Sequence, residues 1–414
     1  MTGGALRAGL PVPADFARPP SEAQRAAWTE SDRAARPARL ARLRERFAAE
    51  SVDAYFGVRR EHMRYLTGFT LADGEESSAG NSGQFLVAGD EVVVLADSRY
   101  TIQARREAPD ARLFEAYNNL PEVWPSLLAS VGARRLAVEA GFISHATWSR
   151  LAAAAPDVEL VPVEGWLEDD RATKEPAELE RVAAACAVAD RALAALLPRI
   201  RPGVTEAALA LELEWLMRTG GAEALAFDVA CLAGPEAALP HGAPGDRPVL
   251  DRATLLFDFG AQVAGYRSDM TRTLFVGEPT GRDLAVYELV AAAQRAAIDG
   301  IEAGVRAARD GGTLPTGRAI DEIARSVIAA AGHASHFGHG LGHGIGLATH
   351  EKPSLSRRAP EVPLPRRTVF SVEPGVYLDG ETGVRIEDLV AMDADARRVE
   401  RLTHFPRDVL VVGG

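Results

Sequence analysis

The chain has little that would tie it to a membrane or to an oxidising compartment. It holds only two cysteines, Cys186 and Cys231, which form neither a disulfide framework nor a zinc ribbon, so a reducing compartment fits best. It has no uncharged apolar stretch of about 18 residues, the length that a membrane-spanning helix needs. The first twenty residues are interrupted by prolines and lack the apolar core of a signal peptide. We therefore expect a cytoplasmic protein without a membrane partner.

The sequence also lacks an excess of positive charge. Its 46 lysines and arginines stand against 58 aspartates and glutamates, which gives a net charge of -12. Because phosphate binding needs a basic face, nucleic acid is not an expected partner. A hydrophobic fraction of 47% in 414 residues indicates a globular protein, and the length predicts two or three domains.

The order of the expected elements divides the chain into four parts. Residues 1–36, rich in Pro, Ala, Gly and charge, are expected to form a partly disordered arm. Residues 37–163 alternate strand and helix patterns and predict an α/β domain with a mixed sheet. Residues 164–178 are polar and contain a proline, as a linker does. Residues 179–414 begin with long helices, one capped by Thr205, and end in strands.

A pair of aspartates stands in the first of two expected hairpins. Leu255–Phe257 leads into Asp258, and a Gly-containing break precedes Asp269. A turn centred on Val263 and Ala264 would set the two acids opposite each other, about 5 Å apart. Such a pair repels unless a cation lies between the carboxylates. The segment alone leaves two interpretations open, a metal site or two surface acids paired with neighbouring arginines.

A pair of glutamates occupies the second expected hairpin. Glu373 and Glu387 are equidistant from Gly380, so a turn there would oppose them on apolar strands. Buried acids are rare unless they are paired or bind metal. A salt bridge to Arg385 is the alternative for one glutamate, but it does not account for both acid pairs.

A glycine-rich stretch, residues 338–347, places glycine at every second position. This argues against a helix, since each glycine costs about 1 kcal/mol there. As a strand, it would carry His339, Leu341, His343, Ile345 and Leu347 on one face and leave the other open to a neighbouring backbone. His350 follows. Four carboxylates with one or two imidazoles suit Mn²⁺, Co²⁺, Fe²⁺ or Zn²⁺ in a two-metal hydrolase site.

These motifs together resemble those of the pita-bread metallopeptidases, the family of methionine aminopeptidase, prolidase and aminopeptidase P. The resemblance covers residues 179–414 and is carried by Ala238–Gly242, Asp258–Gly260, Gly265–Thr273, the glycine-rich stretch with His350 and Glu351, Val372–Gly375, and Gly383–Asp388. It implies an α/β (α+β) architecture with a pita-bread catalytic domain. Residues Tyr65–Phe69, Gly80–Gly83 and Asp97–Ala104 resemble the creatinase-like N-terminal domain of prolidases and aminopeptidases P.

The resemblance implies a role for each site residue. Two divalent metal ions, manganese being expected and cobalt, zinc or iron the alternatives, would be held by Asp258, Asp269, His343, Glu373 and Glu387. Glu373 would also act as general base on a water bridging the ions. His241 and His350 would contact the scissile peptide, His339 would lie in the pocket for proline, and Arg385 would order the site.

The expected activity is hydrolysis of an Xaa-Pro bond at the N-terminus of small proline-containing peptides, as in aminopeptidase P. The alternative is prolidase, which takes only dipeptides and needs a group for their free carboxylate. A non-catalytic peptide-binding protein is a remote alternative, since such proteins usually lose ligands. The family also implies a homodimer, in which the loop 73–81 of a neighbouring subunit could limit substrate length.

Overall fold

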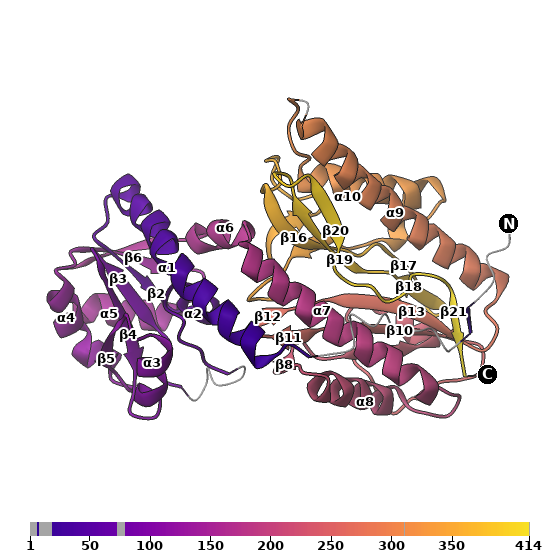
Figure 1. Cartoon of the computed structure of the whole chain (residues 1–414), viewed down its shortest axis with the longest axis horizontal. Coiled ribbons are helices and arrows are strands. Elements are labelled where there is room, and N and C mark those ends of the chain that lie inside the picture. The colour runs from indigo at the N-terminus through magenta and orange to yellow at the C-terminus, as the bar shows by residue number, and fades with distance from the viewer. Residues whose placement is uncertain (1–5, 8–18, 73–78, 310, 414) are drawn as a thin grey trace. The chain divides into compact units, whose positions relative to one another are not determined.

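The computed structural model describes residues 6–7, 19–72, 79–309 and 311–413, and it divides the chain into two compact units (Figure 1). Unit 1 comprises residues 1–25 and 171–414, and unit 2 comprises residues 26–170. Residues 1–5 and 8–18 of the expected N-terminal arm and residues 73–78 of the loop 73–81 lie outside the described residues. None of the helices in the described part of the chain is long and apolar enough to cross a bilayer.

Unit 2 is built on one six-stranded mixed sheet with the strand order β5-β4-β3-β2-β6-β7. Its strands are β2 (Ala54–Gly57), β3 (Phe85–Ala88), β4 (Glu91–Ala96), β5 (Arg112–Glu115), β6 (Arg135–Glu139) and β7 (Glu159–Val163). The β2–β3 and β3–β4 pairs are antiparallel, and the other pairs are parallel. The mixed sheet that the sequence predicts is thus confirmed.

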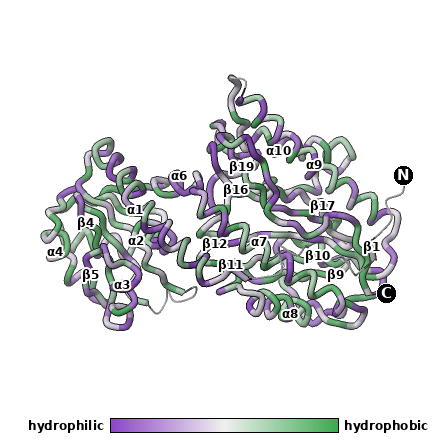
Figure 2. Tube along the Cα trace, viewed as in Figure 1, coloured by the Kyte–Doolittle hydropathy of each residue, from purple (hydrophilic) through white to green (hydrophobic). Residues whose placement is uncertain are grey.

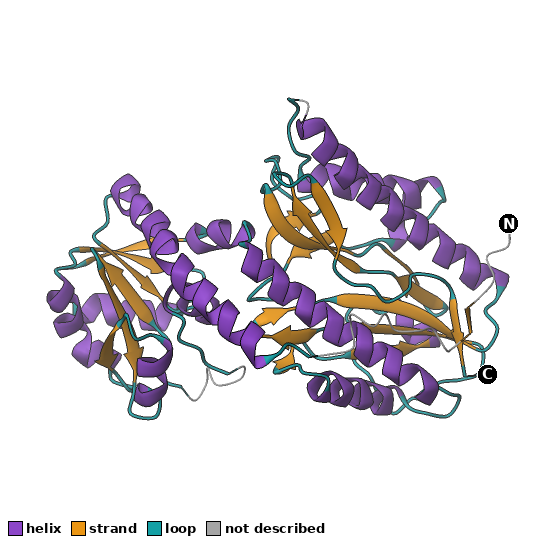
Figure 3. Cartoon of the chain, in the orientation of Figure 1, coloured by secondary structure: helices purple, strands orange, loops and turns teal. Residues whose placement is uncertain are grey.

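In the part of the chain that the structure describes, several helices accompany this sheet (Figure 3). They are α1 (Glu22–Glu50), α2 (Arg60–Thr67), α3 (Thr101–Glu107), α4 (Leu120–Val131), α5 (His145–Ala154) and α6 (Trp166–Ala172). A core around Phe56, Leu86 and Trp124 packs between the sheet and the helices. Residues 22–36 of the expected partly disordered arm are helical, because they belong to α1. The predicted linker 164–178 is largely helical as well, because α6 and the start of α7 occupy it.

Unit 1 contains four sheets. One has the strand order β1-β21-β13-β10-β9, a second β12-β11-β8, a third β15-β14-β16-β19-β20, and the fourth pairs β17 with β18. The strands of the first two are β1 (Leu6–Arg7), β8 (Ala224–Leu225), β9 (Ala230–Ala233), β10 (Ala253–Phe259), β11 (Ala261–Val263), β12 (Tyr266–Arg267), β13 (Met270–Val276) and β21 (Leu410–Val412). The others are β14 (Gly342–Gly344), β15 (Glu351–Leu355), β16 (Arg367–Val372), β17 (Gly375–Leu378), β18 (Thr382–Arg385), β19 (Asp388–Asp393) and β20 (Arg398–Arg401).

Two pairs of helices cover these sheets (Figure 1). They are α7 (Pro176–Leu196), α8 (Glu206–Thr219), α9 (Gly281–Arg309) and α10 (Gly317–Ala330). Helices α7 and α8 pack against β9, β11 and β12, whereas α9 and α10 pack against β15 to β18 and β20. The predicted cap of α8 is confirmed, since the Thr205 hydroxyl accepts the Ala208 N–H at 3.2 Å. Figure 2 shows hydrophobic residues in many of the strands of unit 1, among which the acids of the site also stand.

Candidate metal centre

The first hairpin delivers two aspartates to one face but does not oppose them directly. Asp258 pairs with Thr271, and Gln262 pairs with Arg267. The turn is therefore Ala264–Gly265, with φ angles of 47° and 80° as a two-residue type I′ loop requires. The predicted centre at Val263–Ala264 is wrong by one residue. Because side chains alternate along a strand, Asp269 still shares the face of Thr271 and lies diagonally from Asp258.

The second hairpin opposes its glutamates as the sequence predicts. The pairs Val372–Asp388 and Gly375–Arg385 keep one register on either side of Glu373 and Glu387. Gly380, with φ 72°, lies in the turn between β17 and β18. The glutamates occupy the break between two strand pairs, where the chain passes from one sheet to another.

The glycine-rich stretch forms a much shorter strand than the five-residue face predicted for it. Only residues 342–344 are extended, as β14, and the register shifts between His343 and Gly344. The expected close approach of backbone is confirmed. A Cβ atom on Gly342 would overlap the carbonyl oxygen of Ser371, and one on Gly344 would overlap that of Lys352. The strand therefore sits tightly between its neighbours and holds His343 in place.

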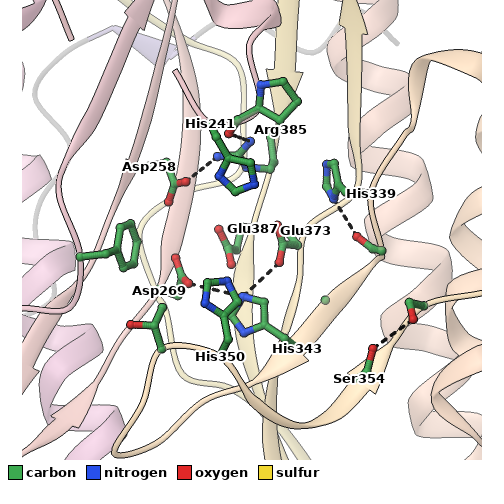
Figure 4. Close-up of a pocket in the computed structure, with 16 residues that line it drawn as sticks. His241, Asp258, Asp269, His339, His343, His350, Ser354, Glu373, Arg385 and Glu387 are labelled. Atoms are coloured by element: carbon green, nitrogen blue, oxygen red, sulfur yellow. Dashed lines mark hydrogen bonds and ion pairs between the residues drawn. The ribbon is translucent and has the colours of Figure 1, made fainter. Parts of the chain in front are cut away.

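All nine side chains that the sequence assigns to the site line one cavity of about 390 Å³ in unit 1 (Figure 4). They are His241, Asp258, Asp269, His339, His343, His350, Glu373, Arg385 and Glu387. Phe227, Pro240, Thr349, Ser354 and Ser356 also contribute to the lining. In Figure 4 the four carboxylates point toward a common space, with the His343 and His350 imidazoles beside them.

The cavity concentrates negative charge that the protein only partly neutralises. Burial raises the pKa of Asp269 well above its usual range, and the charges of Glu387 and Asp258 raise it further. Burial likewise raises the pKa of Glu387, with Glu373 and Asp258 as the next causes. The pKa of Glu373 is raised by burial, although His339 and Arg385 oppose the shift.

Arg385 is the buried cation of the site and is held by neighbours on both sides. Its Nη2 donates to Asp258 Oδ2 at 2.6 Å, and its Nε donates to Thr271 Oγ1 at 2.8 Å. Thr271 Oγ1 in turn donates to Glu387 Oε2 at 2.7 Å. Burial alone would lower the pKa of Arg385, but Tyr377 and the facing carboxylates raise it above its usual value. Arg385 therefore stays charged and fixes one oxygen of Asp258.

Tyr377 is a site residue that the sequence reasoning missed. Its hydroxyl accepts from Arg385 Nη1 at 2.8 Å and lies 2.8 Å from His339 Nε2. His339 Nδ1 lies 2.7 Å from the Gly340 carbonyl and donates to it, so Nε2 accepts the Tyr377 proton. Period-two alternation from Glu373 would have placed Tyr377 on the same strand face.

The His343 imidazole is prepared to act as a ligand. Its Nδ1 lies 3.0 Å from the Gly344 carbonyl, and burial lowers its pKa. With Nδ1–H donated to that carbonyl, the Nε2 lone pair is free to face the acids. Nε2 lies 3.4 Å from Glu373 Oε1 and 3.7 Å from Asp269 Oδ2.

Comparison with known families identifies the family to which the chain belongs. Residues 180–394 match the family model described as metallopeptidase family M24, and residues 39–173 match the creatinase/prolidase N-terminal domain. The chain belongs to metallopeptidase family M24. It is therefore an enzyme, and its fold is that of the pita-bread family that the sequence motifs resemble.

Relatives of this metallopeptidase match it over almost their whole length. An uncharacterised peptidase of Bacillus subtilis is 33% identical over 90% of this chain and 100% of its own. A Xaa-Pro dipeptidase of Pyrococcus horikoshii is 30% identical over 87% and 95%. Among solved structures, an X-Pro aminopeptidase from Thermotoga maritima is 32% identical and covers 90% of this chain and 99% of its own, with a TM-score of 0.80. A Xaa-Pro dipeptidase from Bacillus anthracis is 30% identical with the same coverage and TM-score.

Membership of this family implies divalent metal ions, and the residues of the cavity fit them. One ligand atom from each of Asp269, His343 and Glu387 lies within 4.8 Å of the others. Among the described residues, Asp258 Oδ1 and Glu387 Oε1 are buried oxygens without a hydrogen-bond partner. Buried acceptors are nearly always paired, and an acid-rich set of this kind is what a divalent cation satisfies.

Proposed function

We propose that this M24 metallopeptidase is a Xaa-Pro aminopeptidase, which removes the residue before proline from peptides of three or more residues. Relatives named both Xaa-Pro dipeptidase and X-Pro aminopeptidase support the bond type. The alternative within the family is a dipeptidase that accepts only Xaa-Pro. The two activities differ in what lies beyond the proline: a free carboxylate in the dipeptide and a peptide bond in longer substrates.

The charge of the cavity lining supports the aminopeptidase over the dipeptidase in this proposal. Among the described residues that line the cavity, Arg385 is the only lysine or arginine. Its guanidinium already donates to Asp258, Thr271 and Tyr377. Gly340, Ser354 and Ser356, which also line the cavity, carry no charge. A lining of this kind offers no spare guanidinium or ammonium group to a free carboxylate, whereas hydroxyl groups suit the neutral backbone of a continuing peptide.

Five residues would hold two divalent ions in this proposal, namely Asp258, Asp269, His343, Glu373 and Glu387. Bound there, the ions would polarise the scissile carbonyl and lower the pKa of a water molecule. Glu373 would accept the proton of that water as general base. We propose manganese as the native metal, with cobalt, zinc or iron as alternatives, because the set is rich in oxygen.

The remaining side chains of the cavity would bind the peptide. His350 and His241 would contact the carbonyl and hold the scissile bond. Burial lowers the pKa of His350, and the neighbouring His343 lowers it further, so a neutral imidazole faces the substrate. His339, fixed by Tyr377, would border the proline ring. We further propose a homodimer in a reducing compartment, the latter supported by two buried free cysteines in the described chain.

The experiment that tests this proposal compares Ala-Pro with Ala-Pro-Ala as substrates in the presence of Mn²⁺, Co²⁺ or Zn²⁺. We expect hydrolysis of the tripeptide with kcat/KM at least about tenfold above that of the dipeptide, which corresponds to about 1.4 kcal/mol. Turnover of the dipeptide alone would assign the protein to the alternative. Ala-Ala-Ala is the control for proline, and equal turnover of that peptide would refute a proline-specific activity.

A further inference from the structure

His350 stands at the end of a short loop whose other residues are hidden. Residues 345–349 connect β14 to β15 and are all buried, whereas His350 is exposed to the cavity. Its imidazole ring centroid lies 4.2 Å from that of His343. The place of His350 over the site is therefore determined by whatever holds the buried loop.

Arg267 holds the loop from one side. Its backbone N–H donates to the Gly346 carbonyl at 2.9 Å, and its Nη1 donates to Thr349 Oγ1 at 3.1 Å. Thr349 Oγ1 also donates to the carbonyl of Ala226 at 3.0 Å. These contacts fix the two ends of the loop against the first hairpin.

Glu351 holds the loop from the other side. Its Oε1 accepts the Ala348 N–H at 2.7 Å and a bond from Arg171 Nη2, and its Oε2 lies 3.2 Å from Lys174 Nζ. The three charged side chains are only 4%, 3% and 1% exposed, respectively. A Cβ atom on Gly346 would lie 2.9 Å from Glu351 Oε2 and 3.1 Å from Lys174 Cε. The loop backbone is thus packed directly on this ion cluster.

The carboxyl group of Glu351 is held in its charged form. Burial alone would raise the pKa of Glu351, but Arg171, Lys174 and the Ala348 N–H lower it to about 2. In this cluster one carboxylate faces two cations, so there is no carboxylate–carboxylate repulsion of the kind found among the acids of the metal site. Glu351 does not line the cavity; its backbone pairs with Gly344, and its side chain bonds the Ala348 N–H of the loop, Arg171 and Lys174.

We propose that Glu351, held by Arg171 and Lys174, is a positioning residue that sets the place of the His350 imidazole over the reaction site. The proposal rests on the proposed function, in which His350 contacts the substrate carbonyl. Arg171 and Lys174 lie in the segment 164–178 that sequence composition assigns to a linker, so this connection has a part in the geometry of the catalytic site. Removing the charge of Glu351 would release the loop and leave His350 mobile, while the metal ligands keep their own supports.

Two variants and a matched control test the proposal in the full chain. Glu351→Gln keeps an acceptor for the Ala348 N–H but removes the charge. Lys174→Met is the milder change, because it leaves Glu351 paired with Arg171. The control is Asp190→Asn, which alters another buried carboxylate of unit 1 that accepts backbone N–H groups, those of His404 and Phe405. Asp190 does not line the cavity.

A spectroscopic measurement reports the environment and mobility of the His350 imidazole independently of activity. Histidine labelled with ¹³C at Cε1 gives one ¹H–¹³C signal per ring in the Zn²⁺-loaded protein, and His350→Ala identifies the His350 signal by its absence. We expect Glu351→Gln and Lys174→Met to shift and broaden that signal, and Asp190→Asn to leave it in place. An unmoved His350 signal in both test variants would overturn the proposal whatever the enzyme hydrolyses.

Kinetics on Ala-Pro-Ala then test whether a change at Glu351 alters catalysis by displacing His350. We expect Glu351→Gln to lower kcat by about 10- to 100-fold at unchanged metal content, the scale of a misplacement of about 1 Å. In the His350→Ala background the same change should alter kcat less than about twofold, because residues that act together are not additive. Equal losses in both backgrounds would refute the positioning role. A wild-type enzyme inactive on Xaa-Pro peptides would refute the proposed function instead, with the imidazole signal still testing the loop.

Discussion

Asp269 and Glu387 are acids whose pKa is raised because burial and neighbouring carboxylates disfavour their charged forms. For such a group the folded pKa lies above the unfolded value, which is about 4. Its stabilising contribution is fully present below the unfolded pKa and is lost as pH rises through the folded pKa. Ionising these acids in the metal-free protein therefore reduces its stability, and a bound cation would offset that loss.

Removing one of these charges should stabilise the metal-free protein. We expect Asp269→Asn to raise the free energy of unfolding at pH 7 by about 1–3 kcal/mol, since it replaces an uncompensated buried charge with a neutral group of the same shape. At pH 5, nearer the protonated state of Asp269, the gain should shrink. Chemical denaturation in the presence of a chelator measures both values. An equal gain at the two pH values, or no gain at pH 7, would contradict the charge argument.

Glu373 should be indispensable for hydrolysis without being indispensable for folding. Glu373→Ala should lower kcat/KM on a Xaa-Pro peptide by at least about 10²-fold, the lower end of general acid–base contributions. The control is Glu381→Ala in the same hairpin, where the side chain is half exposed and pairs with Arg282. Steady-state kinetics with a thermal melt of each variant provide the measurement. Undiminished turnover by Glu373→Ala would refute its assignment as base.

The sequence predicts the identity of the cavity residues better than their connections. The spacing of acids and histidines indicated the two carboxylate pairs and the glycine-rich stretch with His350, and the family resemblance added His241 and Arg385; all nine of these side chains line the cavity. No role was predicted for the Glu351 side chain because its partner is distant in sequence: the Arg171 that bonds Glu351 lies 180 residues away. Such bonds depend on the packing of several elements, and no local pattern specifies them.

At the scale of elements, hairpin register was the main error, and its origin is physical. The stretch Val263-Ala264-Gly265 offers two possible two-residue turns, and Ala264 gives no sign that it adopts a positive φ. The error moves the partner of Gln262 from Gly265 to Arg267, a shift of two positions. Because strand side chains repeat every two residues, the face of each aspartate was still predicted correctly.

Helix α1 extends into the segment for which the composition predicts a partly disordered arm. It continues from Glu22 to Glu50 with Pro37 inside, so residues 22–36 are helical. Trp28, Arg39, Leu43 and Phe47 are buried at spacings of whole helical turns. Burial of this face outweighs the loss of one helical hydrogen bond at proline.

Strand β14 yields a prediction about packing. Gly342→Ala should reduce the free energy of unfolding by about 1–3 kcal/mol, as overpacking does, because its Cβ atom would overlap the Ser371 carbonyl. It should also lower metal affinity by moving the adjacent His343. Gly338→Ala is the matched control, since a Cβ atom there meets nothing within 4 Å. Denaturant melts and metal titrations of the two variants make the comparison, which would fail if both behaved alike.

At the scale of the whole molecule, every proposed metal ligand belongs to unit 1. A ligand that binds only the folded state stabilises the part of the chain that holds its site, by about 2.7 kcal/mol at a concentration 100 times Kd. Scanning calorimetry should therefore show that added metal raises the transition of unit 1, with little effect on the transition of unit 2. Limited proteolysis identifies which residues unfold in each transition. A shift of the unit 2 transition alone would contradict this assignment of the ligands.

The close packing of β14 also affects how mutational scans of this enzyme should be interpreted. Gly342 and Gly344 have no side chain to lose, yet any other residue places a Cβ atom on a neighbouring carbonyl. A mutant library that is scored only for activity will show Gly342 and Gly344 to be as intolerant of substitution as His343, which lies between them. A map of sensitive positions would then suggest that three consecutive residues take part in catalysis, although only His343 has a side chain that could do so. Scoring abundance alongside activity separates them: glycine variants fall in both, whereas a His343 variant falls in activity alone.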